Sequence, residues 1–152
     1  MNKNRILIAL SESDKTKVGK EDFELQSVPQ KVFSSIWTLE SEVNNGGFSQ
    51  YFQNSDSAET VAFVATALET TGALNAADIC KRAISCAFPA GVPSKAQSIS
   101  DAASHFTDAT LEKLEALDAE FMAYPDNLTD LLFAYVAQHP REFGELPQPE
   151  ET

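Results

Sequence analysis

Residues 42–54 read EVNNGGFSQYFQN, with a pair of glycines between a helical stretch and three aromatic residues. Apolar residues repeat at helical spacing up to about Val43, which predicts an amphipathic helix that ends near this residue. Gly46 or Gly47 can take the left-handed backbone conformation that ends a helix, which a residue with a Cβ adopts only with strain. The sequence therefore predicts a helix break at the glycine pair.

The residues after the glycine pair are predicted to form a short helix over about 47–53. Phe48, Tyr51 and Phe52 are spaced i, i+3, i+4, so one side of this helix carries three rings into the core. Three asparagines, a residue type typical of caps and turns, flank the segment: Asn44, Asn45 and Asn54. An anion site on the glycine amides is disfavoured, because no strand precedes them and no phosphate-binding glycine pattern surrounds them. The stretch indicates a structural motif.

Helical periodicity and boundary residues predict the other elements. They are a polar helix or loose arm over 4–17, helices over about 27–43, 56–72, 75–87, 108–124 and 128–138, and a Pro, Gly and Ser-rich loop over 89–100. Three N-terminal caps are predicted, by Ser27 with Gln30, by Asp56 with Glu59 and by Asn75. No convincing strand or internal repeat is found. The expected fold is all-α, a single compact domain of about six to seven helices.

Length and composition fit this fold. A chain of 152 residues with 43% hydrophobic residues suits one domain with a sizeable core. We divide it into a basic N-terminal helix or arm (1–26), a helical domain (27–144) and a tail (145–152) that we expect to be disordered. The longest apolar run near the N-terminus, Ile6 to Leu10, is far shorter than a signal-peptide core or a membrane span. A cytoplasmic location is therefore expected.

Residue types that often carry chemistry are sparse. Cys80 and Cys86 lie on different faces of a predicted helix, and we expect reduced thiols rather than a disulfide or metal site. The two histidines, His105 and His139, are accompanied by no recognisable catalytic or metal-binding motif. A di-metal site in a helical bundle needs an ExxH arrangement on two helices, which this sequence lacks. No enzyme activity, cofactor or metal is predicted.

The charge is spread unevenly. Residues 1–20 hold five basic and two acidic groups, a net charge of +3, so the total of −12 leaves −15 on residues 21–152. Direct binding to nucleic acid is disfavoured, because it needs clustered Lys and Arg to displace counterions. A cationic partner is favoured, since a large field of one sign steers opposite charges toward it. Solubility alone is the alternative explanation of the acidity.

The acidic residues are densest over 108–130, where seven stand against one basic residue. We predict that these seven bind a partner: Asp108, Glu112, Glu115, Asp118, Glu120, Asp126 and Asp130. Carboxylates three or four residues apart on a helix are separated by about 5–6 Å along its axis, within reach of the phosphate spacing on one DNA strand. Four apolar residues are predicted to form the buried seam: Leu111, Leu114, Leu117 and Phe121. A merely solvated outer face is the alternative.

The run EVNNGGFSQYFQNS, with ALETTGA at 67–73 and LLFAYVAQHPREF at 131–143, resembles a family of small bacterial domains whose best-known member is a DNA-mimic protein. The resemblance covers roughly 27–144. It implies an all-helical fold, and an acidic face that imitates duplex phosphates and occupies a DNA-binding protein.

We therefore expect a non-enzymatic acidic protein that occupies the DNA-binding face of a regulatory or other DNA-binding protein. Five further carboxylates join the acidic ridge if the fold brings them alongside: Glu40, Glu42, Asp56, Glu59 and Glu69. Two alternatives stay open, an interaction or immunity-type module that uses an apolar or mixed surface, and an enzyme of uncharacterised type. The sequence does not identify the partner, and it leaves the oligomeric state open, with a homodimer as one possibility.

Overall fold

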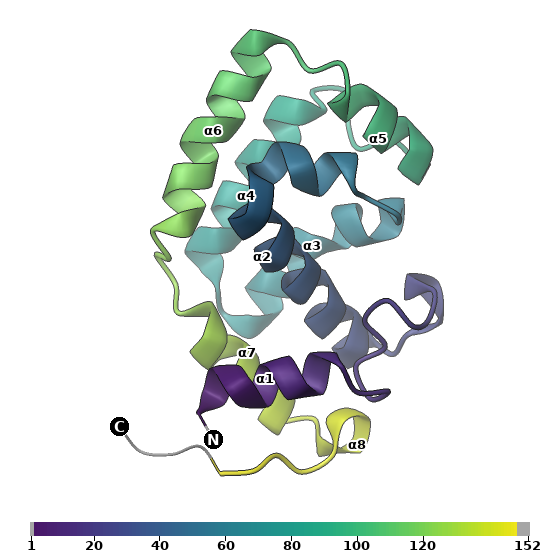
Figure 1. Ribbon diagram of the computed structural model, residues 1–152, viewed down its shortest axis with the longest axis vertical. Coiled ribbons are helices and arrows are strands. Elements are labelled where there is room, and N and C mark those ends of the chain that lie inside the picture. Colours follow the sequence, from purple (N-terminus) through teal and green to yellow (C-terminus); the bar gives the residue numbers. More distant parts are fainter. Residues whose placement is uncertain (1, 149–152) are drawn as a thin grey trace.

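The computed structural model describes residues 2–148, and this part of the chain is helical without a strand (Figure 1). The elements in chain order are α1 (Lys3–Ser11), the 3₁₀ helix η1 (Phe23–Leu25), α2 (Val28–Gln53), α3 (Ala58–Thr71), α4 (Leu74–Ala87), α5 (Ala96–Ala103), α6 (Asp108–Met122), α7 (Leu128–Ala137) and α8 (Pro140–Phe143). The predicted all-α fold is confirmed, and the bounds of α6 and α7 lie close to those predicted.

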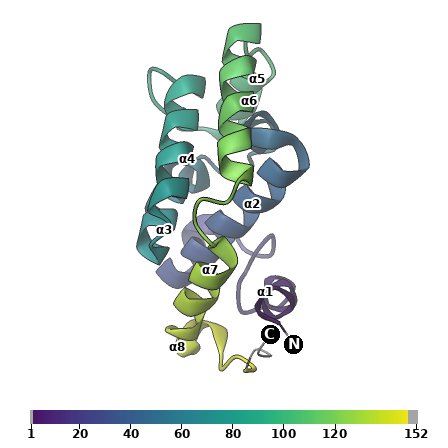
Figure 2. The same ribbon diagram turned by 90° about the vertical axis from the view of Figure 1, so that its left-hand side faces the viewer.

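Helix α2 is the centre of the fold. Helices α3, α5, α6 and α7 all contact it, and α4 packs against α3 and α6 (Figures 1 and 2). Its apolar face is fully buried, including Phe33, Leu39 and Val43. At the bottom of Figure 1, α1 packs against α7, and α8 follows α7 and contacts it. One hydrophobic cluster links all these helices, as expected for a single domain.

The glycine pair breaks α2 as predicted. Gly46 has φ −159° and ψ 17°, and Gly47 has φ 78° and ψ −177°, so neither residue is helical. The conformation of Gly47 combines a positive φ with an extended ψ, and it is therefore not the left-handed helical conformation that we expected. The predicted burial of the three rings is confirmed, because Phe48, Tyr51 and Phe52 are all buried. The Phe48 ring meets the ring of Phe121 on α6 edge-on, with centroids 5.8 Å apart.

The three asparagines of the motif have different positions. Asn54 is the C-terminal cap residue of α2, and its side-chain amide donates to the Glu42 carboxylate at 3.0 Å. Asn44 and Asn45 lie within α2 before the kink, so they are not turn residues. The Asn44 amide donates to the Tyr124 hydroxyl at 2.7 Å. Only the third asparagine thus has the capping position that its residue type favours.

Of the three predicted caps, one is confirmed. The Ser27 hydroxyl accepts from the backbone N–H of Gln30, and the Gln30 side chain accepts from the N–H of Ser27, which is the predicted capping box of α2. Helix α3 is capped by Ser57 and not by Asp56, because the Ser57 hydroxyl is the group that reaches a first-turn N–H, that of Thr60. Helix α4 already begins at Leu74, so Asn75 lies inside its first turn.

The N-terminal segment, for which a helix or a loose arm was open, forms α1. Three of its apolar residues are buried against the rest of the protein: Ile6, Leu7 and Leu10. The segment is therefore integrated into the fold, although its pattern of apolar residues is poor. At the other end, Leu146 packs against the core from the beginning of the predicted tail. Residues 149–152 of that tail lie outside the described residues.

Part of the predicted loop over 89–100 is helical. Helix α5 includes residues 96–100, and Ile99 within it is fully buried. The helix contacts α2, where the Ser100 hydroxyl donates to the backbone carbonyl of Gln53 at 2.5 Å. The burial of Ile99 and the contact with α2 stabilise a helix in a segment whose composition predicts a loop.

Cys80 and Cys86 are both free thiols in the described part of the chain. Burial raises the pKa of the Cys80 thiol to about 12, which makes it a poor nucleophile. Among residues 2–148, no helix is long and apolar enough to cross a membrane.

Candidate functional site: the α6 acidic face and a polar cavity

Helix α6 presents the acidic residues that the sequence singled out. The Thr107 hydroxyl caps its first turn by accepting from the N–H of Thr110 at 3.1 Å, and Asp108 follows where a negative charge complements the helix dipole. Leu114 and Phe121 are buried in the predicted seam, as is Leu117. Leu111 was expected there but is 39% exposed, so the buried seam of α6 begins at Leu114.

Three of the seven predicted carboxylates form an exposed row along one side of the helix, which we call the α6 acidic face: Asp108, Glu112 and Glu115. At 100° and 1.5 Å per residue, they lie within an arc of about 60° and span about 10 Å along the helix axis. Within residues 2–148, none of the three has an ion-pair partner. Lys113 points to another side of α6, about 100° from Glu112. The face therefore keeps its negative charge.

Asp118 is turned inward and supports the kink in α2. Its Oδ1 accepts from the backbone N–H of Phe48 at 2.8 Å. Gly46 and Gly47 leave the helical conformation just before this N–H, which therefore belongs to the first turn of the second half of α2. Burial raises the pKa of the Asp118 carboxyl, and the hydrogen bond from Phe48 opposes this rise. Asp118 thus acts as an N-terminal cap for the second half of α2, although it lies 70 residues after Phe48 in the sequence.

Glu120 is paired with arginine on α4. The Arg82 guanidinium donates two parallel hydrogen bonds to it at 3.0 and 2.9 Å, and a third to Asp78 at 3.0 Å. The hydrogen bonds from Arg82 lower the pKa of Glu120, and they raise that of Arg82 in return. The arginine therefore ties α4 to α6 and offsets the charge of Glu120.

Asp126 and Asp130 also have partners within the chain. Asp126 accepts from the backbone N–H of Ala76 at 2.8 Å and from the Asn75 amide at 3.1 Å, so it caps α4 in place of the predicted Asn75. Asp130 pairs with the Lys3 ammonium at 3.1 Å. Four of the seven predicted carboxylates are therefore engaged inside the chain, and the exposed acidic ridge is shorter than expected.

The five further carboxylates do not extend the α6 acidic face as free charges. Glu40 is half-buried and accepts from the Tyr124 hydroxyl at 2.9 Å; burial raises its pKa. Glu59 pairs with a lysine, and so does Glu69. Glu42 accepts from two side-chain amides, including that of Gln50 at 2.8 Å. Of the five, only Asp56 is exposed without a hydrogen-bond or ion-pair partner in the described chain.

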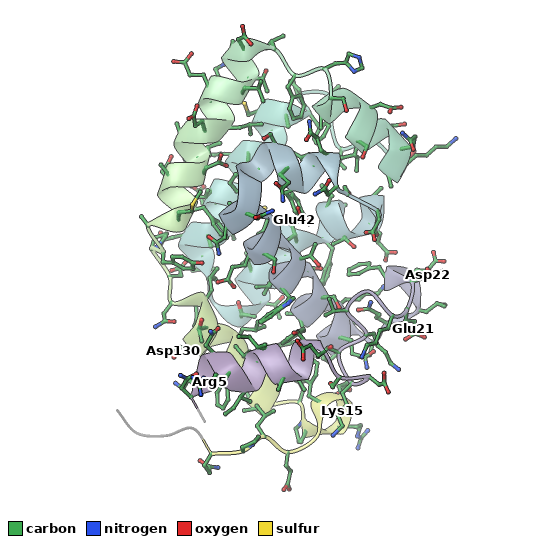
Figure 3. The ribbon with its side chains drawn as sticks, viewed as in Figure 1. Arg5, Lys15, Glu21, Asp22, Glu42 and Asp130 are labelled. Atoms are coloured by element: carbon green, nitrogen blue, oxygen red, sulfur yellow. The ribbon has the colours of Figure 1, made fainter. Side chains whose placement is uncertain are left out.

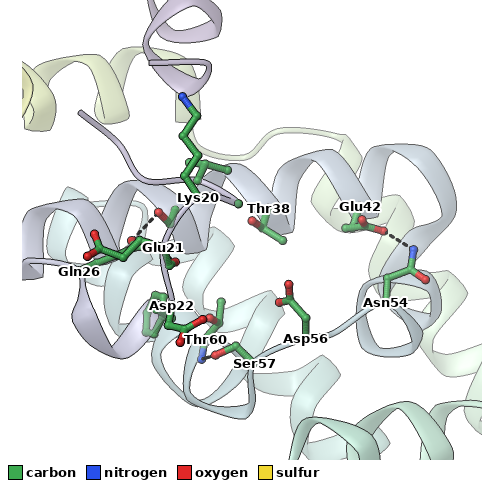
Figure 4. A pocket seen from close by; sticks show the side chains of 14 residues that line it. Lys20, Glu21, Asp22, Gln26, Thr38, Glu42, Asn54, Asp56, Ser57 and Thr60 are labelled. Carbon is green, nitrogen blue, oxygen red and sulfur yellow. Dashed lines mark hydrogen bonds between the residues drawn. The ribbon is translucent and has the colours of Figure 1, made fainter. Parts of the chain in front are cut away.

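A polar cavity of about 430 Å³ lies beside α2, and the sequence did not predict it (Figure 4). Its floor is a row of side chains four residues apart on one face of α2, namely Ser34, Thr38 and Glu42. Residues 18–23 form one wall, and residues 54–60 form the opposite wall. No single stretch of the sequence signals the cavity, because its lining comes from three separate segments.

The wall over 18–23 is held in place by a buried hydrogen-bond network. The Gln26 amide donates to the carbonyls of Lys17 and Glu21, both at 3.2 Å. Its side-chain oxygen accepts from the Ser34 hydroxyl at 2.7 Å, and the same hydroxyl is 3.2 Å from the carbonyl of Thr16. These hydrogen bonds hold the wall over 18–23 against α2.

The cavity is acidic. Four carboxylates line it: Glu21, Asp22, Glu42 and Asp56. The ammonium group of Lys20 points away from it in Figure 4, toward Asp14 at 3.2 Å and the carbonyl of Glu12 at 2.6 Å. Among the described residues, no group of three or more His, Cys, Asp or Glu side chains is placed to hold a metal ion. The chemistry of the lining suits a cationic hydrogen-bonding group.

The histidines bond to the backbone. The Nδ1 atoms of His105 and His139 each lie 2.8 Å from the carbonyl oxygen four residues earlier, of Asp101 and Tyr135. Each ring is thus oriented by its own helix or turn.

The chain matches a known protein family. The family model described as DMP19-like protein matches residues 24–139, from within η1 to His139, which lies two residues after the end of α7. No curated protein and no solved structure showed a significant match to the chain. The family match covers well over half of the sequence and nearly coincides with the range of 27–144 expected from it. The chain therefore belongs to the family of DMP19-like proteins.

Proposed function

We propose that this protein is a non-enzymatic acidic decoy that occupies the DNA-binding face of a regulatory or other DNA-binding protein and excludes DNA from it. The observation that carries the proposal is the α6 acidic face, where Asp108, Glu112 and Glu115 stand exposed in one rank without intramolecular ion pairs in the described chain. The resemblance to a family with a DNA-mimic member supports the same role.

The geometry suits lysine and arginine side chains that normally contact phosphates. A carboxylate offers these side chains two acceptor oxygens, and an arginine can bind it through two parallel hydrogen bonds. The three carboxylates of the α6 acidic face repeat about every 4.5 to 6 Å along the helix, the same order as the phosphate spacing of about 3.4 Å along the duplex axis on one DNA strand. The face therefore offers basic side chains a short substitute for one DNA strand.

The charge of the whole protein adds a long-range contribution. The formal net charge is −12, and a field of this sign speeds the approach of a basic partner. Because exposed charges are screened by salt, complex formation should weaken steeply between about 50 and 200 mM salt. A contact with this salt dependence competes directly with DNA, whose binding depends on salt in the same way.

We propose binding rather than catalysis because the polar groups that the fold brings together mainly hold helices in place. Asp118, Asp126 and Glu120 cap or tie other helices. The cavity beside α2 is lined by carboxylates, hydroxyls and amides and offers a cation a place to bind.

The test is to capture proteins from the source cell on the immobilised protein at low salt and to elute them with high salt. We expect DNA-binding proteins among the eluted species, and we expect the free protein to displace labelled duplex DNA from them. A captured DNA-binding protein that holds its DNA equally well in excess of this protein at low salt would contradict the proposal.

A further inference from the structure

Two aliphatic side chains on the segment that follows one cavity wall are unusually exposed. Leu25 at the end of η1 is 66% exposed, and Val28 at the start of α2 is 64% exposed, although both residue types are mostly buried in proteins. The two residues between them, Gln26 and Ser27, have extended backbone, with φ −75° and ψ 152° and φ −66° and ψ 161°. Leu25 and Val28 are therefore two exposed aliphatic side chains three residues apart on one short segment.

Three carboxylates lie just before Leu25 and Val28 in the same segment. Glu21, Asp22 and Glu24 are exposed, and none has an ion-pair partner in residues 2–148. Hollows lie on both sides of η1: the cavity beside α2, and a second hollow of about 350 Å³ toward α3. Asp22 and Asp56 line both hollows. We call Glu21, Asp22, Glu24, Leu25 and Val28 together the η1 surface.

The η1 surface is held rigidly. Phe23 anchors η1 by burying its ring 5.8 Å from the ring of Phe63 on α3. The ammonium group of Lys31 lies 5.3 Å from the centre of the Phe23 ring and pairs with Glu59. Together with the Gln26 network, these contacts fix the segment that carries Leu25 and Val28. A fixed surface loses little conformational entropy when a partner binds.

We propose that the η1 surface docks a protein segment that carries lysine or arginine side chains beside aliphatic ones. The aliphatic side chains would cover Leu25 and Val28, and the cationic groups would enter the hollows lined by Asp22 and Asp56. The proposal rests on the proposed function only for the positive charge of the partner. Figure 3 places Glu21 and Asp22 on the side of the molecule opposite α6, so this is a second contact surface.

Charge complementarity selects this occupant over the others. Nucleic acids and anionic lipid headgroups would be repelled by the unpaired carboxylates around Leu25 and Val28. A second copy of the chain would bring like charges together if it used the same surface, because Glu21, Asp22 and Glu24 would face their equivalents. A purely apolar segment would leave these carboxylates buried without partners. A basic segment with aliphatic side chains satisfies both kinds of group.

The test uses two matched synthetic peptides and NMR spectra of the full-length protein. One short peptide alternates lysine with leucine, and the other alternates lysine with serine. We expect the lysine–leucine peptide to shift the amide signals of η1 and the first turn of α2. The double variant Leu25→Ser/Val28→Ser should bind this peptide at least about tenfold more weakly, since the contact loses buried aliphatic area. The matched control is Leu74→Ser on α4, which replaces a side chain that is 64% exposed elsewhere and should leave binding unchanged.

Three results would overturn the proposal: signal shifts confined to α6, no binding of the lysine–leucine peptide, or unchanged binding by the double variant. A lysine–serine peptide that binds the η1 surface as tightly as its leucine counterpart would also overturn it, because the apolar pair would then contribute nothing. The spectrum of each variant shows directly whether it is folded. Failure here leaves the α6 acidic face untouched, since that face is tested by DNA displacement and by substitutions on a different helix.

Discussion

The kink in α2 joins residues that are far apart in the sequence. Gly47 has φ 78° and ψ −177°, a combination that residues other than glycine adopt only with strain. A Cβ at this position would also meet the carboxylate of Asp118. The same carboxylate accepts the Phe48 N–H, so the absence of a side chain at Gly47 lets the cap approach the backbone. Backbone conformation, close approach and capping are therefore linked at a single residue.

Replacing Gly47 with alanine should destabilise the protein by about 2 kcal/mol or more, through backbone strain and displacement of Asp118. The matched control is Gly19→Ala, at φ +68° with nothing within 4 Å of the added Cβ. This control should cost only about 1 to 2 kcal/mol, the strain of a left-handed residue. Urea unfolding of both variants measures the difference. Equal losses would show that the contact with Asp118 does not matter.

The half-buried Glu40 should make stability depend on pH. Burial raises its pKa above the ordinary value of 4.5, and the hydrogen bond from Tyr124 opposes this rise. Between the ordinary and the raised pKa, the folded state binds more protons than the unfolded state, so the free energy of unfolding falls as pH rises through this window. Glu40→Gln removes this dependence while it keeps an acceptor for Tyr124.

Urea unfolding of the wild type and Glu40→Gln at about pH 4 and about pH 7 tests this effect. The variant should gain stability relative to the wild type as the pH rises from 4.5 upward. Parallel pH profiles of the two proteins would argue against a raised pKa at Glu40.

At the scale of elements, α4 depends on a cap from outside its own sequence. The residue before it, Ala73, has no side chain that can accept a hydrogen bond, and Asp126 supplies the acceptor for Ala76. Asp126→Ala should therefore fray the first turn of α4 and cost about 1 kcal/mol, the usual loss for an N-terminal cap. Hydrogen exchange of the amides at residues 75–78 should speed up. Unchanged exchange there would contradict the capping role, and Asp126→Asn, which keeps an acceptor, serves as the milder control.

The structural features that could be predicted from the sequence are those that depend on residues within one helix. The capping box of α2 follows from Ser27 and Gln30, three residues apart, and the helix break follows from Gly46 and Gly47 beside an aromatic run. The cap of α4 could not be predicted, because Asp126 lies 50 residues beyond Ala76. Likewise, α5 is helical where composition favours a loop, since burial against α2 outweighs local preference.

The candidate site shows the same division. The acidic character of α6 is visible in the sequence, and helical spacing places Asp108, Glu112 and Glu115 on one face. Which carboxylates are engaged elsewhere depends on other helices: Asp118 reaches the kink in α2, and Glu120 reaches Arg82 on α4. The cavity beside α2 needs three separate segments to form, so no single stretch could reveal it.

At the scale of the whole molecule, the charges are arranged along its length. Figure 3 places Arg5 and Lys15 at the end of the molecule that is remote from the first turn of α6. The α6 acidic face therefore lies away from the basic N-terminal segment, whose charges do not cancel its field. A basic partner should approach the end where α6 begins, which agrees with the proposed role of that face.

The most direct test is DNA displacement by two variants of equal charge. One carries Asp108→Lys, Glu112→Lys and Glu115→Lys; the other carries Glu12→Lys, Asp101→Lys and Glu145→Lys, at exposed positions outside both proposed surfaces. Each reversal adds two units, so both variants change the net charge from −12 to −6.

The measurement is the anisotropy of labelled duplex DNA on a captured DNA-binding protein at low salt. The scattered variant should still displace the DNA, whereas the α6 variant should need at least about tenfold more protein, because like charges now face the basic partner. Equal displacement by the α6 variant and the wild type, or equal losses in both variants, would contradict the claim that the α6 acidic face replaces DNA.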